Sequence, residues 1–227
     1  MKRILLTCAG LLALAGSIGA AQAADLSRPP PPAAAPYYSP SYNWTGFYAG
    51  LNGGGAFGDS TWSAIATTYN VSGGMIGGQL GYNWQMGQFV WGLEGDADWA
   101  SLSGNTTSPA CFPAIAPCFT KSDFLATFRG RLGVAFDRFM PYATGGLAIG
   151  NIRTSTTTIP GVDITNAGWT VGAGLEFAIA GPWTAKVEYL FVDLGNVGCG
   201  FACGFAGPGN TVSLTENVIR AGINYRF

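Results

Sequence analysis

The chain has 227 residues, a formal net charge of −1, 48% hydrophobic residues and only 10% charged residues. Ordinary soluble domains carry about 25% charged residues, so this chain lacks the ionic side chains that cover a soluble surface. The lack of histidine excludes a Ser-His-Asp triad and imidazole-ligated metals, and the near-neutral charge argues against a nucleic-acid partner.

The first 23 residues have the form of a secretory signal peptide. Lys2 and Arg3 precede an apolar run from Ile4 to about Ala21, and residues 21–23 read Ala-Gln-Ala, the small-x-small pattern at which signal peptides are cut. The run is also short for a membrane-spanning helix of about 20 residues. We therefore expect residues 1–23 to be removed and the mature chain to be exported.

Residues 24–42 contain a run of prolines that favours extended polyproline II structure and disfavours a central strand. We expect this segment to be a periplasmic arm. Peptidoglycan and other envelope proteins are candidate partners for it.

From Asn43 onward, apolar and polar residues alternate in segments of about 10 to 15 residues, which is the period of a β-strand. Turn residues separate the segments, and no apolar run is long enough for a membrane helix. The pattern predicts one all-β domain over residues 43–227. Its eight strands are expected at 44–57, 73–85, 88–101, 122–137, 140–153, 166–180, 183–195 and 214–227.

The faces on which the charges lie indicate what kind of barrel these strands form. In the segment 88–101, Trp91 and Leu93 share one face while Glu94 and Asp96 share the other. An eight-stranded barrel encloses room only for packed side chains or one small ligand, so the bulky face must point outward into lipid. A closed barrel also pairs every backbone group, as hydrocarbon requires. The sequence therefore predicts a transmembrane, antiparallel, up-and-down β-barrel.

Ten charged side chains fall on the predicted interior face. Because acids and bases are balanced, they can pair into a plug, whereas a selective channel usually presents a ring of one sign. A narrow water-filled conduit remains the alternative interpretation. The ten residues are Glu94, Asp96, Asp98, Arg129, Arg131, Glu176, Lys186, Glu188, Arg220 and Arg226.

The connections fit an outer-membrane barrel, which has short periplasmic turns and longer external loops. Tight links are expected near residues 86–87, 138–139 and 181–182, and long loops at 58–72, 102–121, 154–165 and 196–213. Both termini would then lie on the periplasmic side. Aromatic girdles are expected at the two interfaces, with Trp44, Trp84, Phe136, Trp183 and Phe227 on the periplasmic side and Trp99, Phe124 and Trp169 on the outer side.

Four cysteines remain in the expected mature chain, all of them in the long loops. An even number in an exported chain predicts disulfides. One bridge within each loop, Cys111 to Cys118 and Cys199 to Cys203, is the simplest pairing, although four cysteines allow three connectivities. The spacings do not match zinc knuckles, so we expect no metal and no cofactor.

Four segments resemble a known family. Residues 43–50 (NWTGFYAG), 141–148 (PYATGGLA), 186–195 (KVEYLFVDLG) and 220–227 (RAGINYRF) resemble strands of the porin-like outer-membrane immunogenic proteins, which have an OmpA-type eight-stranded barrel. The resemblance implies a bacterial outer-membrane protein whose C-terminal aromatic residues, Tyr225 and Phe227, are recognised by the barrel-assembly machinery. It supplies no catalytic residues.

We therefore expect a structural outer-membrane barrel that contributes to envelope integrity and presents surface loops. A narrow channel for ions or very small solutes, and a loop-borne adhesin or receptor, are the alternatives. Outer-membrane lipid and lipopolysaccharide are the expected surroundings. We do not expect an enzyme, because histidine, the usual general base, is missing.

Overall fold

The computed structural model describes residues 42–63, 66–107, 117–156, 162–198 and 211–227. The expected signal peptide and nearly all of the expected arm lie outside these ranges. Within them, no helix is long and apolar enough to cross a membrane. The described residues form eight strands: β1 (Gly46–Trp62), β2 (Thr67–Met86), β3 (Phe89–Thr107), β4 (Pro117–Val134), β5 (Phe139–Thr156), β6 (Val162–Ala180), β7 (Trp183–Gly198) and β8 (Thr211–Arg226).

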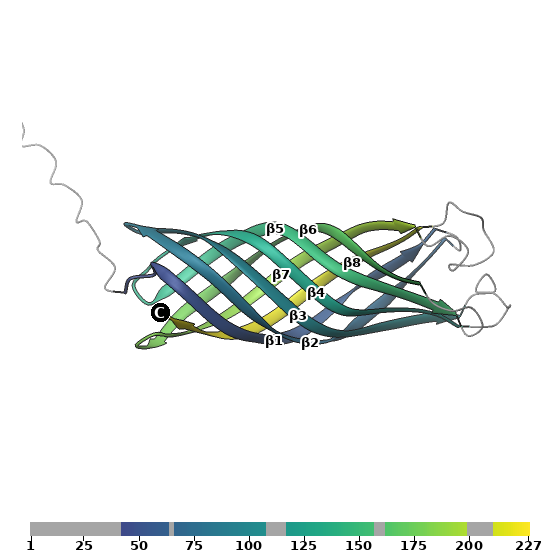
Figure 1. The fold of residues 1–227 in the computed structure, drawn as a ribbon, viewed down its shortest axis with the longest axis horizontal. Coiled ribbons are helices and arrows are strands. Elements are labelled where there is room, and N and C mark those ends of the chain that lie inside the picture. Colours follow the sequence, from purple (N-terminus) through teal and green to yellow (C-terminus); the bar gives the residue numbers. More distant parts are fainter. Residues whose placement is uncertain (1–41, 64–65, 108–116, 157–161, 199–210) are drawn as a thin grey trace, which may run out of the picture. The chain divides into compact units, whose positions relative to one another are not determined.

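The eight strands close into a single barrel in which each pairs antiparallel with its neighbours in sequence. Closure comes from β1 and β8, which pair from Tyr48 and Arg226 through to Trp62 and Val212. Figure 1 shows the tilted strands, with the short turns and the C-terminus at the same end of the barrel. The predicted fold, an eight-stranded antiparallel up-and-down barrel, is confirmed.

Three tight turns join β2 to β3, β4 to β5 and β6 to β7. Gly87 and Gly181 have φ angles of 64° and 53°, and Asp137 in the middle turn has a φ of 57°. Glycine adopts this left-handed conformation without steric cost, and aspartate tolerates it better than most residues. Because short turns mark the periplasmic end of such barrels, this end is the periplasmic one.

The outer face of the barrel carries a belt of exposed apolar side chains. Trp91, Phe128 and Val187 are 45%, 59% and 56% exposed although they are large and apolar. We call the part of the barrel inside this belt the membrane section. Aromatic side chains lie at both edges of the belt, among them Trp84, Phe136, Trp183 and Phe227 near the turns and Trp99, Phe124 and Trp169 at the opposite edge.

The strands extend further than the sequence pattern predicted, into segments that we expected to be long loops. β1 reaches Trp62 and β2 begins at Thr67, so most of the expected loop 58–72 is a hairpin. Beyond the belt the outward side chains become polar, as at Asp59 and Thr61. We call this part the outer section. It comprises residues 58–62, 67–74, 100–107, 117–123, 150–156, 162–168, 192–198 and 211–218.

The inward side chains change from polar to apolar at the same level along the barrel axis. In the membrane section the inward side chains are mostly charged or polar, whereas toward the outer section they form one apolar cluster. The sequence pattern, which placed ten charged side chains on the interior face, did not predict this inner apolar core. Its buried members are Ala56, Trp62, Tyr69, Val71, Met75, Ala100, Leu102, Cys118, Leu125, Ala148, Ile152, Leu190, Val192, Leu194, Val197, Val212, Leu214 and Val218.

Candidate functional site

Arg129 lies at the centre of a buried ion-pair network inside the membrane section. Its Nη2 is 2.5 Å from Glu94 Oε1 and 2.8 Å from Asp96 Oδ2, and its Nη1 is 2.9 Å from Glu188 Oε1. Strand β4 supplies the arginine, β3 supplies Glu94 and Asp96, and β7 supplies Glu188. One guanidinium thus joins side chains from three strands across the interior.

Arg220 on β8 connects the same acids from another side of the barrel. Its Nη1 is 2.9 Å from Asp96 Oδ1 and 2.6 Å from Asp98 Oδ2, and its Nε donates to Glu188 Oε2 at 2.9 Å. A guanidinium presents its donors in a fixed fork that suits several carboxylates at once. The two arginines therefore hold four acids between them, and they share Asp96 and Glu188.

Arg131 and Lys186 complete the network on the periplasmic side of Arg129. Arg131 Nη2 is 2.6 Å from Glu176 Oε2, and its guanidinium lies 4.0 Å from the centre of the Tyr142 ring. Lys186 Nζ is 2.9 Å from Glu94 Oε1. The Tyr48 hydroxyl donates to Glu94 Oε2 at 2.7 Å.

The network comprises nine of the ten predicted interior charges, and all nine side chains are buried. Each of its four bases lies within 4 Å of at least two carboxylates. Taking charges out of water is costly unless each is paired and hydrogen-bonded. The arrangement satisfies that condition. The paired charges therefore cross-link the strands and fill the interior, and they do not form an ion-selective ring of one sign.

Arg226, the tenth predicted interior charge, lies at the periplasmic mouth, outside this network. Its Nη2 donates to the Thr45 carbonyl oxygen at 2.8 Å, and its guanidinium lies 4.9 Å from the centre of the Tyr42 ring. The prediction placed it inside because its position alternates with Tyr225. It is the last residue of β8, where the barrel opens, so it reaches the segment that precedes β1.

Trp44 was expected in the periplasmic girdle, but it is fully buried at the mouth of the barrel. Its indole Nε1 donates to the Asp137 carbonyl oxygen at 3.1 Å, and its backbone N–H donates to Gln85 Oε1 at 2.6 Å. It belongs to a buried cluster with Val90 of β3, Met140 and Tyr142 of β5, Ala178 of β6, and Ala135, which follows β4. Residues 42–45 therefore form a cap over the periplasmic mouth, which we call the Trp44 cap.

The inner apolar core contains a small polar node and one isolated acid. The Thr120 hydroxyl lies 2.6 Å from the Tyr69 hydroxyl and accepts from Trp62 Nε1 at 3.2 Å. Glu216 is 1% exposed, and its Oε1 has no hydrogen-bond partner. This acid was not among the ten predicted interior charges. The signal was available, because Glu216 alternates with outward residues and shares the inward face of β8 with Leu214 and Val218.

Of the four loop cysteines, only Cys118 lies within the described residues. It is buried in the inner apolar core and is disulfide-bonded. Cys111, Cys199 and Cys203 lie outside the described ranges, so the connectivity stays a prediction. The described part of the chain holds no group of three or more potential metal ligands.

The end of the chain lies at the closing seam of the barrel. Tyr225 is outward and lies 5.1 Å from the Trp183 ring, and the Phe227 backbone N–H donates to the Phe47 carbonyl oxygen at 3.0 Å. The Phe227 side chain is 80% exposed. These two aromatic side chains therefore face the lipid at the periplasmic edge of the belt.

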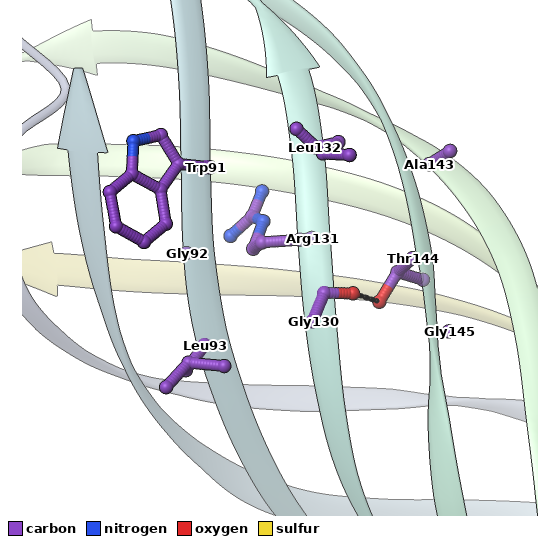
Figure 2. A pocket seen from close by; sticks show the side chains of 9 residues that line it. All are labelled: Trp91, Gly92, Leu93, Gly130, Arg131, Leu132, Ala143, Thr144 and Gly145. Atoms are coloured by element: carbon purple, nitrogen blue, oxygen red, sulfur yellow. Dashed lines mark hydrogen bonds between the residues drawn. The ribbon is translucent and has the colours of Figure 1, made fainter. Parts of the chain in front are cut away.

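A shallow groove of about 620 Å³ lies on the lipid-facing wall over β3, β4 and β5. Figure 2 shows Trp91, Leu93 and Leu132 around it, and the Thr144 hydroxyl bonded to the Gly130 carbonyl oxygen. The groove exists because Gly130 and Gly145 are paired outward residues between larger side chains. It opens toward hydrocarbon and offers no catalytic group.

A closed barrel with an apolar belt and a charged, ion-paired interior defines an integral outer-membrane β-barrel protein. Residues 10–227 match the family model described as the outer membrane protein beta-barrel domain, and the chain belongs to that family. It is 35% identical over 233 residues to the 31 kDa outer-membrane immunogenic protein of Brucella melitensis, covering 91% of this chain and 93% of the relative. Its location in the outer membrane is thereby confirmed.

Two further comparisons agree. The chain is 33% identical over 190 residues to a 22 kDa outer membrane protein of Rhizobium leguminosarum, covering 83% of this chain and 80% of the relative. Among solved structures, Neisserial surface protein A aligns with a TM-score of 0.50 at 12% identity, covering 81% of this chain and 98% of that one. The Brucella relative confirms the expected resemblance to outer-membrane immunogenic proteins, the Rhizobium relative agrees with the location in the outer membrane, and the Neisserial structure supports the fold.

Proposed function

We propose that the protein is a closed structural barrel that reinforces the outer membrane and presents surface loops, without conducting solutes or catalysing a reaction. The observation that carries the proposal is the ion-pair network. Side chains from β3, β4, β6, β7 and β8 meet in the interior and form ion pairs with one another.

Closure at three heights supports the proposal. The Trp44 cap covers the periplasmic mouth, the network crosses the membrane section, and the inner apolar core fills the outer section. A hydrophobic constriction excludes water and ions by dewetting, and paired charges offer no ring of one sign to select an ion. A narrow channel would need all three regions to part.

The same packing argues against an enzyme. General acid–base catalysis requires a group within hydrogen-bonding reach of a substrate. The network carboxylates among the described residues are buried and bonded to arginine or lysine. The aspartates and glutamates of the network thus serve as structural ion pairs.

Lipid is the partner that the outer wall fits. The groove of Figure 2 lies within the apolar belt, where acyl chains are the surrounding molecules. Above the belt, the polar wall of the outer section stands at the depth of lipid headgroups and of the sugars of lipopolysaccharide. Recognition of Tyr225 and Phe227 by the barrel-assembly machinery, and of peptidoglycan or envelope proteins by the arm, belong to the same proposal.

Deletion of the gene in its own host tests the proposed role. We expect the deletion strain to become more sensitive to detergent and to take up more of a dye that the intact outer membrane excludes. The wild-type gene should restore both properties, and a Val187→Arg version, which we expect to be impaired in insertion, should not. Unchanged detergent sensitivity and dye uptake in the deletion strain would contradict a role in envelope integrity.

A further inference from the structure

Glu216 is the one acid of the described chain that is buried among the apolar residues of the outer section. Its neighbours on the inner face of β8 are Leu214 and Val218, which are fully buried members of the inner apolar core. Glu216 makes no ion pair within the described ranges, and its Oε1 has no hydrogen-bond partner. An ionised carboxylate in such surroundings is strongly disfavoured.

The strands on either side of β8 supply no compensating charge. Glu216 pairs with Gly58 on β1 and with Val192 on β7. The inward residues nearest to these partners, Ala56 and Ser60 on β1 and Leu190 and Leu194 on β7, are uncharged.

The charged groups nearest to Glu216 on β1, β7 and β8 are an arginine that already binds other carboxylates and two acids. Arg220, four residues further along β8, binds Asp96, Asp98 and Glu188. On the outward face, Asp59 and Asp193 both pair with Thr215, the residue before Glu216, so both flanking side chains are acids. Across the interior, the titratable group in the apolar core is the Tyr69 hydroxyl, which is bonded to Thr120. None of these groups stabilises a negative charge on Glu216.

We propose that Glu216 is a proton switch that sets how firmly the outer section of the barrel closes. With a neutral carboxyl group, β8 packs into the inner apolar core alongside β1 and β7. Loss of the proton places an unpaired charge in that core, and the charge is relieved when the outer ends of these strands separate and admit water. The loops that these strands carry would then be presented differently in acidic and alkaline surroundings.

The direction of the pH dependence follows from burial. Glu216 lies in the outer section, beyond the apolar belt, and burial there raises the pKa of its carboxyl group to about 7. The pKa of an exposed glutamate is about 4.3. The closed form is therefore favoured at a pH below about 4.3, the pKa of an exposed glutamate. It becomes progressively less favoured as the pH rises toward about 7, the pKa of buried Glu216.

Hydrogen–deuterium exchange of the folded mature protein in detergent micelles tests the proposal. Wild type and the Glu216→Gln variant, which keeps the shape and removes the charge, are compared at the same pH so that intrinsic exchange rates cancel. The reporting amides are those of residues 192–198 and 211–218, and amides of the membrane section serve as an internal reference. Asp59→Asn is the matched control, because it removes an outward acid one strand away.

At pH 4, below the pKa of an exposed glutamate, we expect nearly equal exchange in all three proteins. At pH 8 the reporting amides of wild type should exchange roughly tenfold faster or more than those of Glu216→Gln, since one unit of pKa difference changes an equilibrium tenfold. Asp59→Asn should behave as wild type. Equal exchange of wild type and Glu216→Gln at pH 8, or the same protection from Asp59→Asn, would overturn the proposal. If Glu216→Gln does not fold, a constant ratio of outer-section to reference exchange in wild type between pH 4 and 8 would also overturn it.

Discussion

Glu188 and Leu190 occupy successive inward positions on β7, yet Glu188 is bound by Arg129 and Arg220 while Leu190 is a fully buried member of the inner apolar core. Two residues of strand span about 7 Å, so the interior changes from charged to apolar over that distance. The outward face changes in the opposite sense, from Val187 and Tyr189 to Asp193. The barrel is therefore built for lipid in its membrane section and for water in its outer section.

Leu194→Ala tests whether the outer section has a true apolar core. Leu194 is fully buried there, and truncating a buried leucine costs about 2–5 kcal/mol. We expect that loss in the free energy of unfolding, measured by urea titration in lipid vesicles. Thr215→Ala, an outward change on the neighbouring strand, should stay within about 0.5 kcal/mol of wild type. Equal losses for the two variants would mean that the interior of the outer section is not packed.

Val187→Arg tests the lipid-facing side of the membrane section. Val187 is 56% exposed in the middle of the belt on β7, and an arginine near the bilayer midplane costs about 2–4 kcal/mol. Folding yield and the urea midpoint in vesicles should both fall. Ser213→Arg, which faces outward above the belt, should fold as wild type does. A neutral result for Val187→Arg would mean that the two faces have been assigned the wrong way round.

Arg129→Met tests the network as a cross-link. The substitution keeps much of the side-chain volume but leaves Glu94, Asp96 and Glu188 with fewer partners, and breaking a buried ion pair by removing one partner costs about 3–5 kcal/mol. We expect a corresponding fall in unfolding free energy. Arg153, whose ion pairs with Asp123 and Asp163 are exposed, provides the comparison. Arg153→Met should leave stability nearly unchanged, and a loss as large as that of Arg129→Met would contradict this distinction.

Trp44→Ala tests the cap over the periplasmic mouth. Removing a fully buried tryptophan costs about 3–5 kcal/mol, and here the Asp137 carbonyl oxygen also loses the hydrogen bond from the indole Nε1. The variant should unfold at lower urea concentration. Trp183→Ala, at a girdle position that is 48% exposed, should lose less. A larger loss at Trp183 would mean that Trp44 is only a girdle residue.

The outer ends of β5 and β6 should respond to acid. The hydrogen bond that Arg153 donates to Asp163 lowers the pKa of this exposed carboxyl group, which lies beyond the belt. A lowered pKa contributes stability that is present above the unfolded value, about 3.9 for aspartate, and is lost as the pH falls through the folded value. Exchange of amides 151–156 and 162–165 should accelerate below about pH 4 relative to Asp163→Asn, compared at equal pH. A ratio of wild-type to Asp163→Asn exchange that stays constant from pH 7 to below pH 4 would contradict this expectation.

The sequence allowed the strand number, the closed barrel and the lipid-facing side to be predicted, because alternation over a whole strand leaves little choice of face. Glu94, Asp96 and Asp98 occupy alternate positions in a segment whose other face carries Trp91, Leu93 and Trp99, so their shared side follows from parity alone. The pairing partners did not follow. Which arginine meets which acid depends on the stagger of the strands around the barrel, and no local pattern records that stagger.

The outer section was missed for a different physical reason. Its outward residues, such as Ser72, Ser103 and Thr215, resemble turn residues, and the alternation there has the opposite polarity from that in the belt. If the outward face of a strand is assumed to meet lipid along its whole length, the predicted strand ends where the polarity reverses. Asp193, which breaks the pattern of β7, marked that reversal. Trp44 was misplaced because it precedes β1, where no strand pairing fixes the direction of a side chain.

Single-channel recording of the purified, folded mature protein in a planar bilayer tests the closed interior most directly, provided that insertion is confirmed separately. With the network, the inner apolar core and the Trp44 cap intact, we expect a silent bilayer. Steady, reproducible current steps that change when Glu94 or Arg129 is neutralised would contradict closure and would establish a narrow conduit through the network.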